Sequence, residues 1–250
     1  MTTRRRRLTA VAITLALAVG ASMLSSSPAG GQTAQPDAVI VGDSLTGGNA
    51  TYIRSTLRAN GLSDVRVEGL SGRKIAETFR IRGVVDSGID RIRSLRSAGV
   101  TPRLWVIELG TNDLYSIKRC GCPDPVAFAG ALIDRLRAEI EPHTPTAWVT
   151  VMNRADYDIT NTFNEALRRR AAVDPYFRLI DWAGLSLMEP SWFLDAVHQS
   201  AAGLVPFSAM YVREIRTLLA DPPGPRPPRP GIQPAARLGS QPRNFAVALR

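Results

Sequence analysis

The sequence predicts an α/β fold, in which a parallel β-sheet lies between two layers of helices. Apolar runs of strand length alternate with stretches that have the period of an amphipathic helix, five times along the chain. Such strand–helix–strand crossovers are right-handed and cover both faces of a parallel sheet. The predicted strands are 38–41, 65–67, 104–107, 147–151 and 177–180, and the predicted helices are 49–59, 87–97, 125–140, 162–172 and 200–219.

Local signals support each element in the first half of the chain. The short apolar run Ala38–Val41 ends at a glycine, as a buried strand should. The helix at 49–59 is stopped by Asn60-Gly61, and a second strand at 65–67 follows. The helix at 87–97 repeats isoleucine and leucine on one face and ends just before a glycine.

The second half continues the alternation. Leu104–Ile107 is the clearest buried strand of the sequence, and the next helix begins at Pro125, a residue that suits the first turn. Arg168–Arg170 lie near the carboxyl end of the fourth helix, where positive charge interacts favourably with the helix dipole. Sites in such sheets lie at the carboxyl ends of the strands, where the strand order reverses.

The net charge of +9 is confined to the two ends of the chain. Residues 1–36 hold four arginines and residues 222–250 hold five, and neither end holds an acidic residue. The remaining 22 basic residues are balanced by 22 acidic ones within 37–221. A nucleic-acid-binding domain carries its basic excess on the folded part, so this charge pattern argues against a nucleic-acid partner.

The N-terminus has the pattern of a secretory signal peptide over residues 1–29. Arg4–Arg7 precede the apolar run Leu8–Leu24, and small residues follow, with a cleavage position after Ala29 and an alternative one after Ala21. The paired arginines also permit twin-arginine export, and an uncleaved membrane anchor is the alternative to cleavage. The expected location is outside the cytoplasm, secreted or in the cell envelope.

The expected domain organisation has three further parts. Residues 30–36 form a short linker, and residues 37–221 form one domain of a size that supports a single core. The segment 222–250 is rich in proline and arginine and is predicted to be disordered. No further membrane span and no repeat is expected, and the oligomeric state is not predicted.

Cys120 and Cys122 are separated only by Gly121. Export allows a disulfide between them, although a ring this small tends to be strained, and two free thiols are the alternative. A zinc site needs about four ligands, and no other cysteine or histidine lies nearby in sequence. Neither a metal nor an organic cofactor is expected.

Ser44 follows the first predicted strand within Gly42-Asp43-Ser44-Leu45. A serine on this turn is exposed above the sheet, and its N–H, close to a helix start, can donate to an oxyanion. Asn112, which follows the third strand within Gly110-Thr111-Asn112-Asp113, offers an amide donor at the same edge. Gly72, past the second strand, offers a backbone N–H. Each residue alone could simply form a cap or a turn.

The choice of a general base falls between the two histidines of the chain. His143 lies in a predicted surface loop, whereas His198 directly precedes the last helix. Asp195 stands three residues upstream of His198 and can fold back to orient the imidazole.

Together, these four motifs resemble the four blocks of the SGNH hydrolase family, also called GDSL esterases and lipases. The resemblance spans about Ala38 to Leu219 and implies a three-layer, flavodoxin-like fold around a mostly five-stranded parallel sheet. It implies Ser44 as nucleophile, His198 as base and Asp195 as its orienting partner, with Ser44, Gly72 and Asn112 forming the oxyanion hole. Ala196 departs from the glycine that many members have after the aspartate. The Gly-x-Ser-x-Gly elbow of α/β-hydrolases is absent from this segment.

The implied activity is hydrolysis of a carboxylic ester, with an acetyl or short acyl group on a glycan, lipid or small molecule. Two alternatives stay open: an acyltransferase acting on a cell-envelope glycan or lipid, and a non-catalytic binding module on the same fold. The loop Tyr115–Asp124 is expected to border the site. Trp192 and Phe193 could line the acyl pocket or pack in the core. Acyl length is not predicted.

Overall fold

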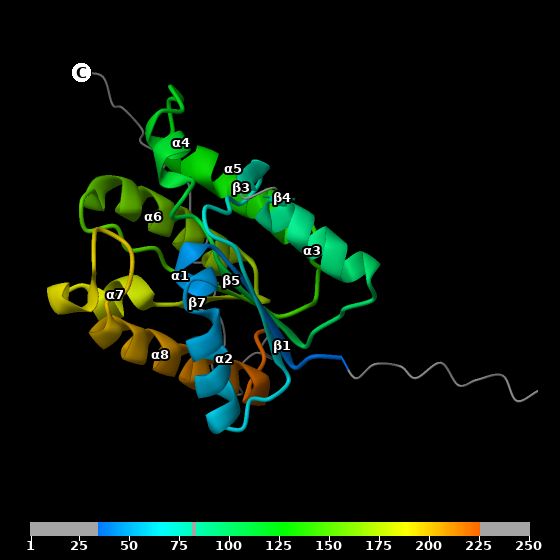
Figure 1. The fold of residues 1–250 in the computed structure, drawn as a ribbon. Coiled ribbons are helices and arrows are strands. Elements are labelled where there is room, and N and C mark those ends of the chain that lie inside the picture. The colour runs from blue at the N-terminus through cyan, green and yellow to red at the C-terminus, as the bar shows by residue number, and fades with distance from the viewer. Residues whose placement is uncertain (1–34, 82–83, 226–250) are drawn as a thin grey trace, which may run out of the picture. The chain divides into compact units, whose positions relative to one another are not determined.

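The computed structural model describes residues 35–81 and 84–225, so the predicted signal peptide and most of the linker and tail lie outside the described residues. The predicted parallel sheet is confirmed, with five strands in the order β2-β1-β5-β6-β7 (Figure 1). The strands are β1 (Ala38–Gly42), β2 (Val65–Gly69), β5 (Leu104–Glu108), β6 (Thr146–Val149) and β7 (Phe177–Ile180).

Helices cover both faces of this sheet, as the alternating pattern predicts (Figure 1). The first layer comprises α3 (Gly88–Ser97), α4 (Leu114–Lys118), α5 (Pro125–Arg137) and α6 (Tyr157–Val173). The second layer comprises α1 (Ser44–Gly47), α2 (Ala50–Ala59), α7 (Trp182–Ser186) and α8 (Ala201–Ala220), with the 3₁₀ turn η1 (Pro190–Trp192) beside it.

Two apolar clusters, one on each face, form the core. Strand β1 contributes to both because successive side chains alternate: Val39 and Val41 belong to the cluster under α3–α6, and Ala38 and Ile40 to the cluster under α2 and α8. All five residues of β1 and of β5 are buried. These two strands therefore form the buried centre of the sheet, and the segments that leave their carboxyl ends are anchored to the core.

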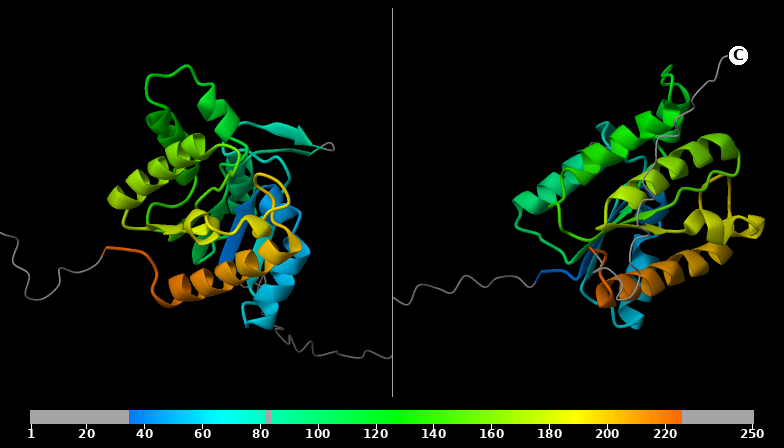
Figure 2. Two further views of the ribbon diagram at one scale, coloured as in Figure 1. Left: turned by 90° about the vertical axis from the view of Figure 1, so that its left-hand side faces the viewer. Right: turned by 180° about the vertical axis from the view of Figure 1, so that it is seen from behind.

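Several elements differ from the sequence-based prediction. Helix α6 begins at Tyr157 rather than at 162, because Asp156 caps its first turn by accepting a hydrogen bond from the N–H of Ile159 at 3.2 Å. The hairpin β3 (Phe79–Ile81) and β4 (Val84–Asp86) was not predicted, and it extends away from the central sheet (Figure 2). Helices α1, α4 and α7 were also missed, since four or five residues are too few for a periodic signal.

The sheet topology indicates where a site should lie. The chain passes from β1 to β2 at one edge and then returns to β5 on the other side of β1, so the strand order reverses between β1 and β5. Gly42 and Glu108 end these two strands side by side in register. The crevice at such a reversal is the usual binding position of an open parallel sheet.

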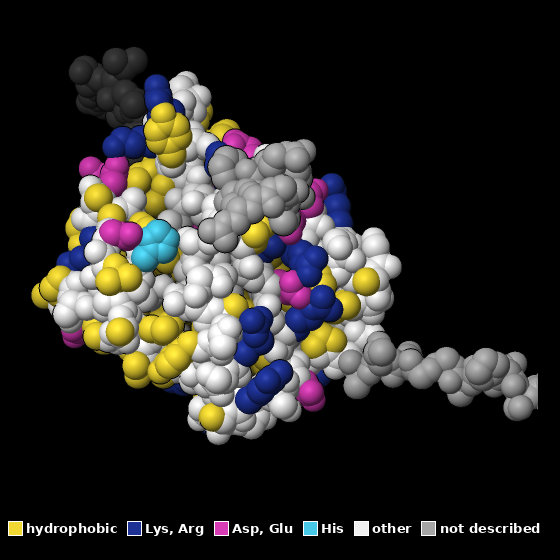
Figure 3. Space-filling model, viewed as in Figure 1, with side chains coloured by type: hydrophobic (Ala, Val, Ile, Leu, Met, Phe, Trp, Pro, Cys, Tyr) yellow, Lys and Arg dark blue, Asp and Glu magenta, His cyan; other side chains and the backbone are white. Residues whose placement is uncertain are grey.

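Charged side chains of both signs are interspersed on the face drawn in Figure 3. This mixture agrees with the balance of acidic and basic residues between positions 37 and 221. Across the described ranges 35–81 and 84–225, no helix is both long enough and apolar enough to cross a membrane.

Candidate active site

Ser44 is the first residue of α1, directly after the turn that leaves β1. Asp43 is the N-cap of this helix, and its Oδ1 accepts a hydrogen bond from the N–H of Leu45 at 3.0 Å. Leu45 is buried in the core on the α2 and α8 side of the sheet. The strand, the cap and the buried leucine therefore fix the backbone on both sides of the serine.

His198 lies next to Ser44 although 154 residues separate them in sequence. The Oγ of Ser44 and the Nε2 of His198 are 2.9 Å apart, and the Nδ1 of His198 lies 2.8 Å from the Oδ2 of Asp195. The structure thus brings Ser44, His198 and Asp195 into one hydrogen-bonded line. This is the geometry of a nucleophile, a base and an orienting carboxylate.

Asp195 is exposed, yet its charged form is strongly favoured. Its Oδ1 accepts hydrogen bonds from the N–H groups of His198 and Val197, both at 2.8 Å. These backbone donors, first His198 and then Val197, lower the pKa of Asp195 to about 2. The Asp195 carboxylate beside the imidazole is therefore ionised at neutral pH.

The loop that carries His198 is fastened at several points. The N–H of Leu194 donates to the carbonyl of His198 at 2.8 Å, which closes the loop on itself. Arg154, which follows β6, donates its N–H to the carbonyl of Ala196 at 2.8 Å and its Nη1 to the carbonyl of Leu187 at 3.1 Å. The Arg154 guanidinium also lies over the ring of Phe193, 5.3 Å from the ring centroid, in a cation–π contact.

Asn112 links the turns that follow β1, β2 and β5. Its Nδ2 donates to the Oδ2 of Asp43 at 3.0 Å and to the carbonyl of Arg73 at 3.2 Å. Gly72, with a φ of 76°, occupies the left-handed region that favours glycine. Across the described part of the chain, neither the N–H of Ser44 nor that of Gly72 has an acceptor. Two backbone donors and one amide donor thus belong to adjoining turns.

Arg73 holds the Gly72 turn against the end of β1. Its Nη1 donates to the carbonyl of Gly42 at 2.8 Å and to that of Glu68, and its Nη2 pairs with Asp86 at 2.8 Å. The guanidinium is almost fully buried. Burial lowers the pKa of Arg73, whereas Asp86 opposes that shift. No motif or spacing in the sequence distinguishes this arginine from the others.

Three buried acidic residues surround the serine turn, and sequence reasoning assigned none of them a role. Burial raises the pKa of Asp43 to about 6 and that of Asp113 to about 7. The pKa of Glu108 is raised well above its usual value by burial and by the neighbouring Asp43. One signal was available in the sequence: Glu108 is a charged residue at the end of an otherwise apolar strand.

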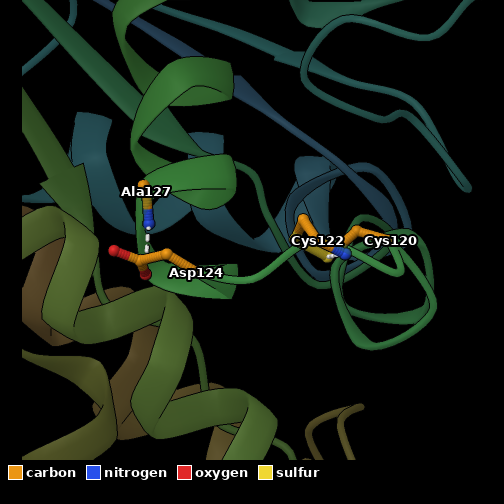
Figure 4. Close-up of a disulfide and its surroundings, with 4 residues drawn as sticks. All are labelled: Cys120, Cys122, Asp124 and Ala127. Atoms are coloured by element: carbon orange, nitrogen blue, oxygen red, sulfur yellow. Dashed lines mark hydrogen bonds between the residues drawn. A yellow bond between two sulfur atoms is a disulfide. The ribbon is translucent and has the colours of Figure 1, made fainter.

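The loop between α4 and α5 contains a disulfide between Cys120 and Cys122, whose Cα atoms are 5.1 Å apart (Figure 4). Gly121 between them has a φ of 60°, which lets the backbone bend. Asp124 then caps α5 by accepting from the N–H of Ala127 at 3.0 Å, as Figure 4 shows. Tyr115, which was predicted to begin this loop, lies instead in helix α4, and it is 65% exposed.

The aromatic residues before Asp195 are partly buried and pack against the core. The rings of Trp192 and Phe193 lie 5.9 and 6.0 Å from the ring of Trp182, beside the apolar cluster under α8. His143 lies 5.1 Å from the ring of Tyr176, away from the Ser44 turn. Over residues 35–81 and 84–225, no group of three or more His, Cys, Asp or Glu residues has the arrangement of a metal site.

Comparisons with known proteins identify the family and the fold of this chain. Residues 40–204 match the model of the GDSL-like Lipase/Acylhydrolase family. Among solved structures, the C-terminal catalytic domain of a Streptococcus pneumoniae peptidoglycan O-acetyltransferase is similar, with a TM-score of 0.55 and 16% identity over 74% of this chain and 93% of that one. A carbohydrate acetylesterase family member from Sinorhizobium meliloti is also similar, with a TM-score of 0.55 and 21% identity over 74% and 99%.

A third similar structure is a carbohydrate esterase family 3 protein from Talaromyces cellulolyticus, with a TM-score of 0.54 and 15% identity over 75% of this chain and 99% of that one. At these identities the three structures show the shared fold. The search of curated proteins found no match.

Proposed function

Because the chain belongs to the GDSL-like lipase/acylhydrolase family, we propose that it cleaves carboxylic esters through an acyl-enzyme formed on Ser44. The family assignment supports an acyl hydrolase or esterase in general terms. The choice of Ser44, and of a carboxylic ester as substrate, depends on the site itself.

One observation carries the proposal: Ser44, His198 and Asp195 form an unbroken line of hydrogen bonds of 2.9 and 2.8 Å. A serine hydroxyl is a weak nucleophile until a base takes its proton. Here the Nε2 of His198 is in position to accept that proton. Asp195, ionised and bonded to Nδ1, stabilises the imidazolium that forms.

In the first half of the proposed reaction, the Oγ of Ser44 attacks the acyl carbonyl while His198 takes the serine proton. The carbonyl oxygen becomes an oxyanion. When the tetrahedral species collapses, the bond to the alcohol breaks and His198 returns the proton to the leaving oxygen. In the second half, water gives a proton to His198 and attacks the acyl carbonyl. The bond to the Oγ of Ser44 then breaks, His198 returns the proton to that Oγ, and the acid is released.

The oxyanion would be held by the N–H of Ser44, the N–H of Gly72 and the Nδ2 of Asn112. The two backbone groups lack protein acceptors in the described part of the chain, which supports this assignment. The hydrogen bond from Asn112 to Asp43, at 3.0 Å, orients the amide, and the longer contact to the Arg73 carbonyl, at 3.2 Å, is the one a developing oxyanion replaces. A donor of this kind contributes about 3 kcal/mol in the transition state.

The proposed substrate carries an acetyl or other short acyl group on a carbohydrate or lipid. The similar solved structures include two members of carbohydrate esterase families and a peptidoglycan O-acetyltransferase domain, which favours a sugar ester. The side chains of His198 and Asp195 are 43% and 55% exposed, so the site is open to a bulky alcohol part. The N-terminal pattern leads us to place the reaction outside the cytoplasm.

Labelling by a fluorophosphonate probe tests the nucleophile. The wild-type protein is expected to react, and Ser44→Ala is expected to lose all labelling. Ser55→Ala, which removes an exposed hydroxyl on α2, is the matched control and should label like wild type. Equal labelling of wild type and Ser44→Ala, or no labelling of either, would falsify the assignment.

The substrate class is tested with a series of p-nitrophenyl esters of increasing acyl length, followed by acetylated sugars. The highest kcat/KM is expected for acetyl or another short acyl group. An acyltransferase is the second candidate, because the open site also admits an acceptor alcohol. Adding a sugar acceptor and following the acyl group separates the two, since a transferase gives an acylated sugar in place of free acid.

A further inference from the structure

A group of polar side chains is sealed directly behind the turn that presents Ser44. Asp43, Thr46 and Tyr211 are 0% exposed, and Glu108 is 3% exposed. They come from the β1–α1 turn, from α1, from α8 and from the end of β5. The proposed reaction uses none of these side chains as nucleophile, base or oxyanion donor.

These side chains form one continuous hydrogen-bonded chain. The Oε2 of Glu108 accepts from the N–H of Asp43 at 3.3 Å and from the hydroxyl of Thr46 at 3.0 Å. The hydroxyl of Thr46 lies 3.1 Å from that of Tyr211, so the tyrosine O–H completes the chain as donor to threonine. The threonine hydroxyl and the Asp43 N–H thus converge on a single oxygen of Glu108.

Asp43 connects this buried chain to the proposed oxyanion donor. Its Oδ1 accepts from the N–H of Leu45 and its Oδ2 accepts from Asn112, each at 3.0 Å. The Glu108 side chain is close enough to this carboxylate that each of the two groups shifts the pKa of the other. Gly42 makes this close approach possible, because a Cβ there would lie 2.4 Å from the Oγ1 of Thr46 and 2.8 Å from the Oε2 of Glu108.

Two neighbouring carboxyl groups in a buried site repel each other when both are ionised, which favours a state in which the pair shares one proton. The surroundings decide which residue keeps it. Asp43 receives two N–H donors and is attracted by the positive charge of Arg73, and both favour its carboxylate form. Glu108 faces the Asp43 carboxylate and two hydroxyl groups, so Glu108 keeps the proton.

We infer that Glu108 is a positioning residue that works as a neutral carboxylic acid. With its Oε2 accepting from Thr46 and Asp43, its acidic O–H donates to the Asp43 carboxylate. That carboxylate then holds the Asn112 amide and the first turn of α1 in the arrangement that the proposed acyl transfer needs. The inference depends on the proposed function for its catalytic meaning, whereas the protonation of Glu108 can be tested without any substrate.

The inference predicts that catalysis weakens at alkaline pH, where Glu108 loses its proton. When Glu108 ionises, its repulsion of Asp43 breaks the O–H donor link and displaces the group that orients Asn112. The neutral form is present below the raised pKa of Glu108 and is lost above it. The titratable or charged groups facing the pair are Tyr211 on α8, Arg73 after β2, His198 before α8 and Asp113 before α4.

The test compares Glu108→Gln, which keeps a neutral donor of the same size, with Glu108→Leu, which removes it. At neutral pH, Glu108→Gln is expected to keep kcat for a p-nitrophenyl ester within about threefold of wild type. Glu108→Leu is expected to lose at least about tenfold in kcat, with KM changed far less, because a misplaced oxyanion donor acts in the transition state. At alkaline pH, wild-type kcat should fall and that of Glu108→Gln should not. Glu165→Gln, on the exposed side of α6, is the matched control.

Infrared spectroscopy provides the readout that needs no substrate. At about pH 8, wild type should show the C=O stretch of a buried neutral carboxylic acid, and the folded Glu108→Gln variant should lack it. If Glu108→Leu does not fold, Glu108→Asp replaces it, since the shorter acid withdraws from Asp43. Three results would overturn the inference. The first is the absence of the acid band in wild type, and the second is an equal loss of activity in Glu108→Gln and in the Leu or Asp variant. The third is a fall of kcat at alkaline pH in Glu108→Gln that matches the fall in wild type. An absence of ester cleavage by wild type would instead count against the proposed function.

Discussion

Replacing Asp113 by asparagine should change how the stability of this fold depends on pH. Asp113 is only 2% exposed, and both of its carboxylate oxygens face the N–H of Ile75 at 3.1–3.2 Å. Burial is the largest cause of its raised pKa of about 7, against an ordinary value of 3.8. The hydrogen bond from Ile75 and the charge of Lys74 oppose that shift without cancelling it.

The direction of the change in stability with pH depends on whether the native or the unfolded state binds the Asp113 proton more tightly. The native state holds the Asp113 proton up to about pH 7, whereas the unfolded chain releases it near pH 4, so stability falls as pH rises between these values. A shift of about 3 pKa units corresponds to about 4 kcal/mol of the free energy of unfolding, fully lost above about pH 7. The asparagine side chain cannot ionise, and its amide oxygen can still accept from the N–H of Ile75.

Urea-induced unfolding, followed by tryptophan fluorescence from about pH 4 to about pH 8, measures this difference. The free energy of unfolding of Asp113→Asn relative to wild type should rise by about 4 kcal/mol across that range. If the new NH₂ group lowers the free energy of unfolding by an amount that does not depend on pH, the difference between variant and wild type is offset at every pH. Its change with pH stays the same. Asp124→Asn, which keeps an N-cap acceptor on α5, is the control and should run parallel to wild type between about pH 5 and pH 8. A gap between Asp113→Asn and wild type that stays constant with pH would refute the reasoning.

Three further outcomes are expected. Gly110→Ala should lower the free energy of unfolding in urea by about 2–4 kcal/mol. Gly110 has a φ of 127°, and an added Cβ would lie 2.4 Å from the ring of Phe163. The control Gly130→Ala, on α5, should not lower it, because an added Cβ there has open space. Arg154→Met should lower kcat for ester cleavage about three- to tenfold with little change in Tm, since it frees the loop that carries His198, and an unchanged kcat would speak against that role. Ser87→Ala should cost about 1 kcal/mol in the same unfolding assay by removing the capping box of α3, and a stability equal to wild type would show that the cap contributes nothing.

Most of the fold could be predicted from the sequence because burial on both faces produces an unambiguous pattern. The strand Leu104–Glu108 is buried along its whole length, and its residues are apolar except for the last. The hairpin at 79–86 could not be predicted, because two strands of three residues give too short a pattern. The predicted start of α6 was off by several residues because an aspartate cap, Asp156, sets it.

The site divides in the same way. The sequence pointed to Ser44, which follows the first predicted strand, and to His198, which has Asp195 three residues upstream. The structure places the Oγ of Ser44 and the Nε2 of His198 2.9 Å apart. Glu108 and Arg73 were not found, because their importance comes from what folding places around them. The Arg73 guanidinium binds the carbonyls of Gly42 and Glu68 and the carboxylate of Asp86, and only folding brings these three groups together.

The buried acids connect stability to geometry at this site. Asp43, Glu108 and Asp113 each resist ionisation, so burying them lowers stability at neutral pH relative to neutral side chains of similar size. Each also accepts a backbone N–H from one of the turns around Ser44: those of Leu45, Asp43 and Ile75 respectively. An apolar replacement would remove that ionisation cost, yet it would take the side-chain acceptors away from the N–H groups of Leu45 and Ile75. The N–H of Asp43 would keep only its second acceptor, the backbone carbonyl of Glu108 at 3.2 Å. The stability lost to burying the acids is therefore tied to the same contacts that hold Ser44 and the turns around it in place.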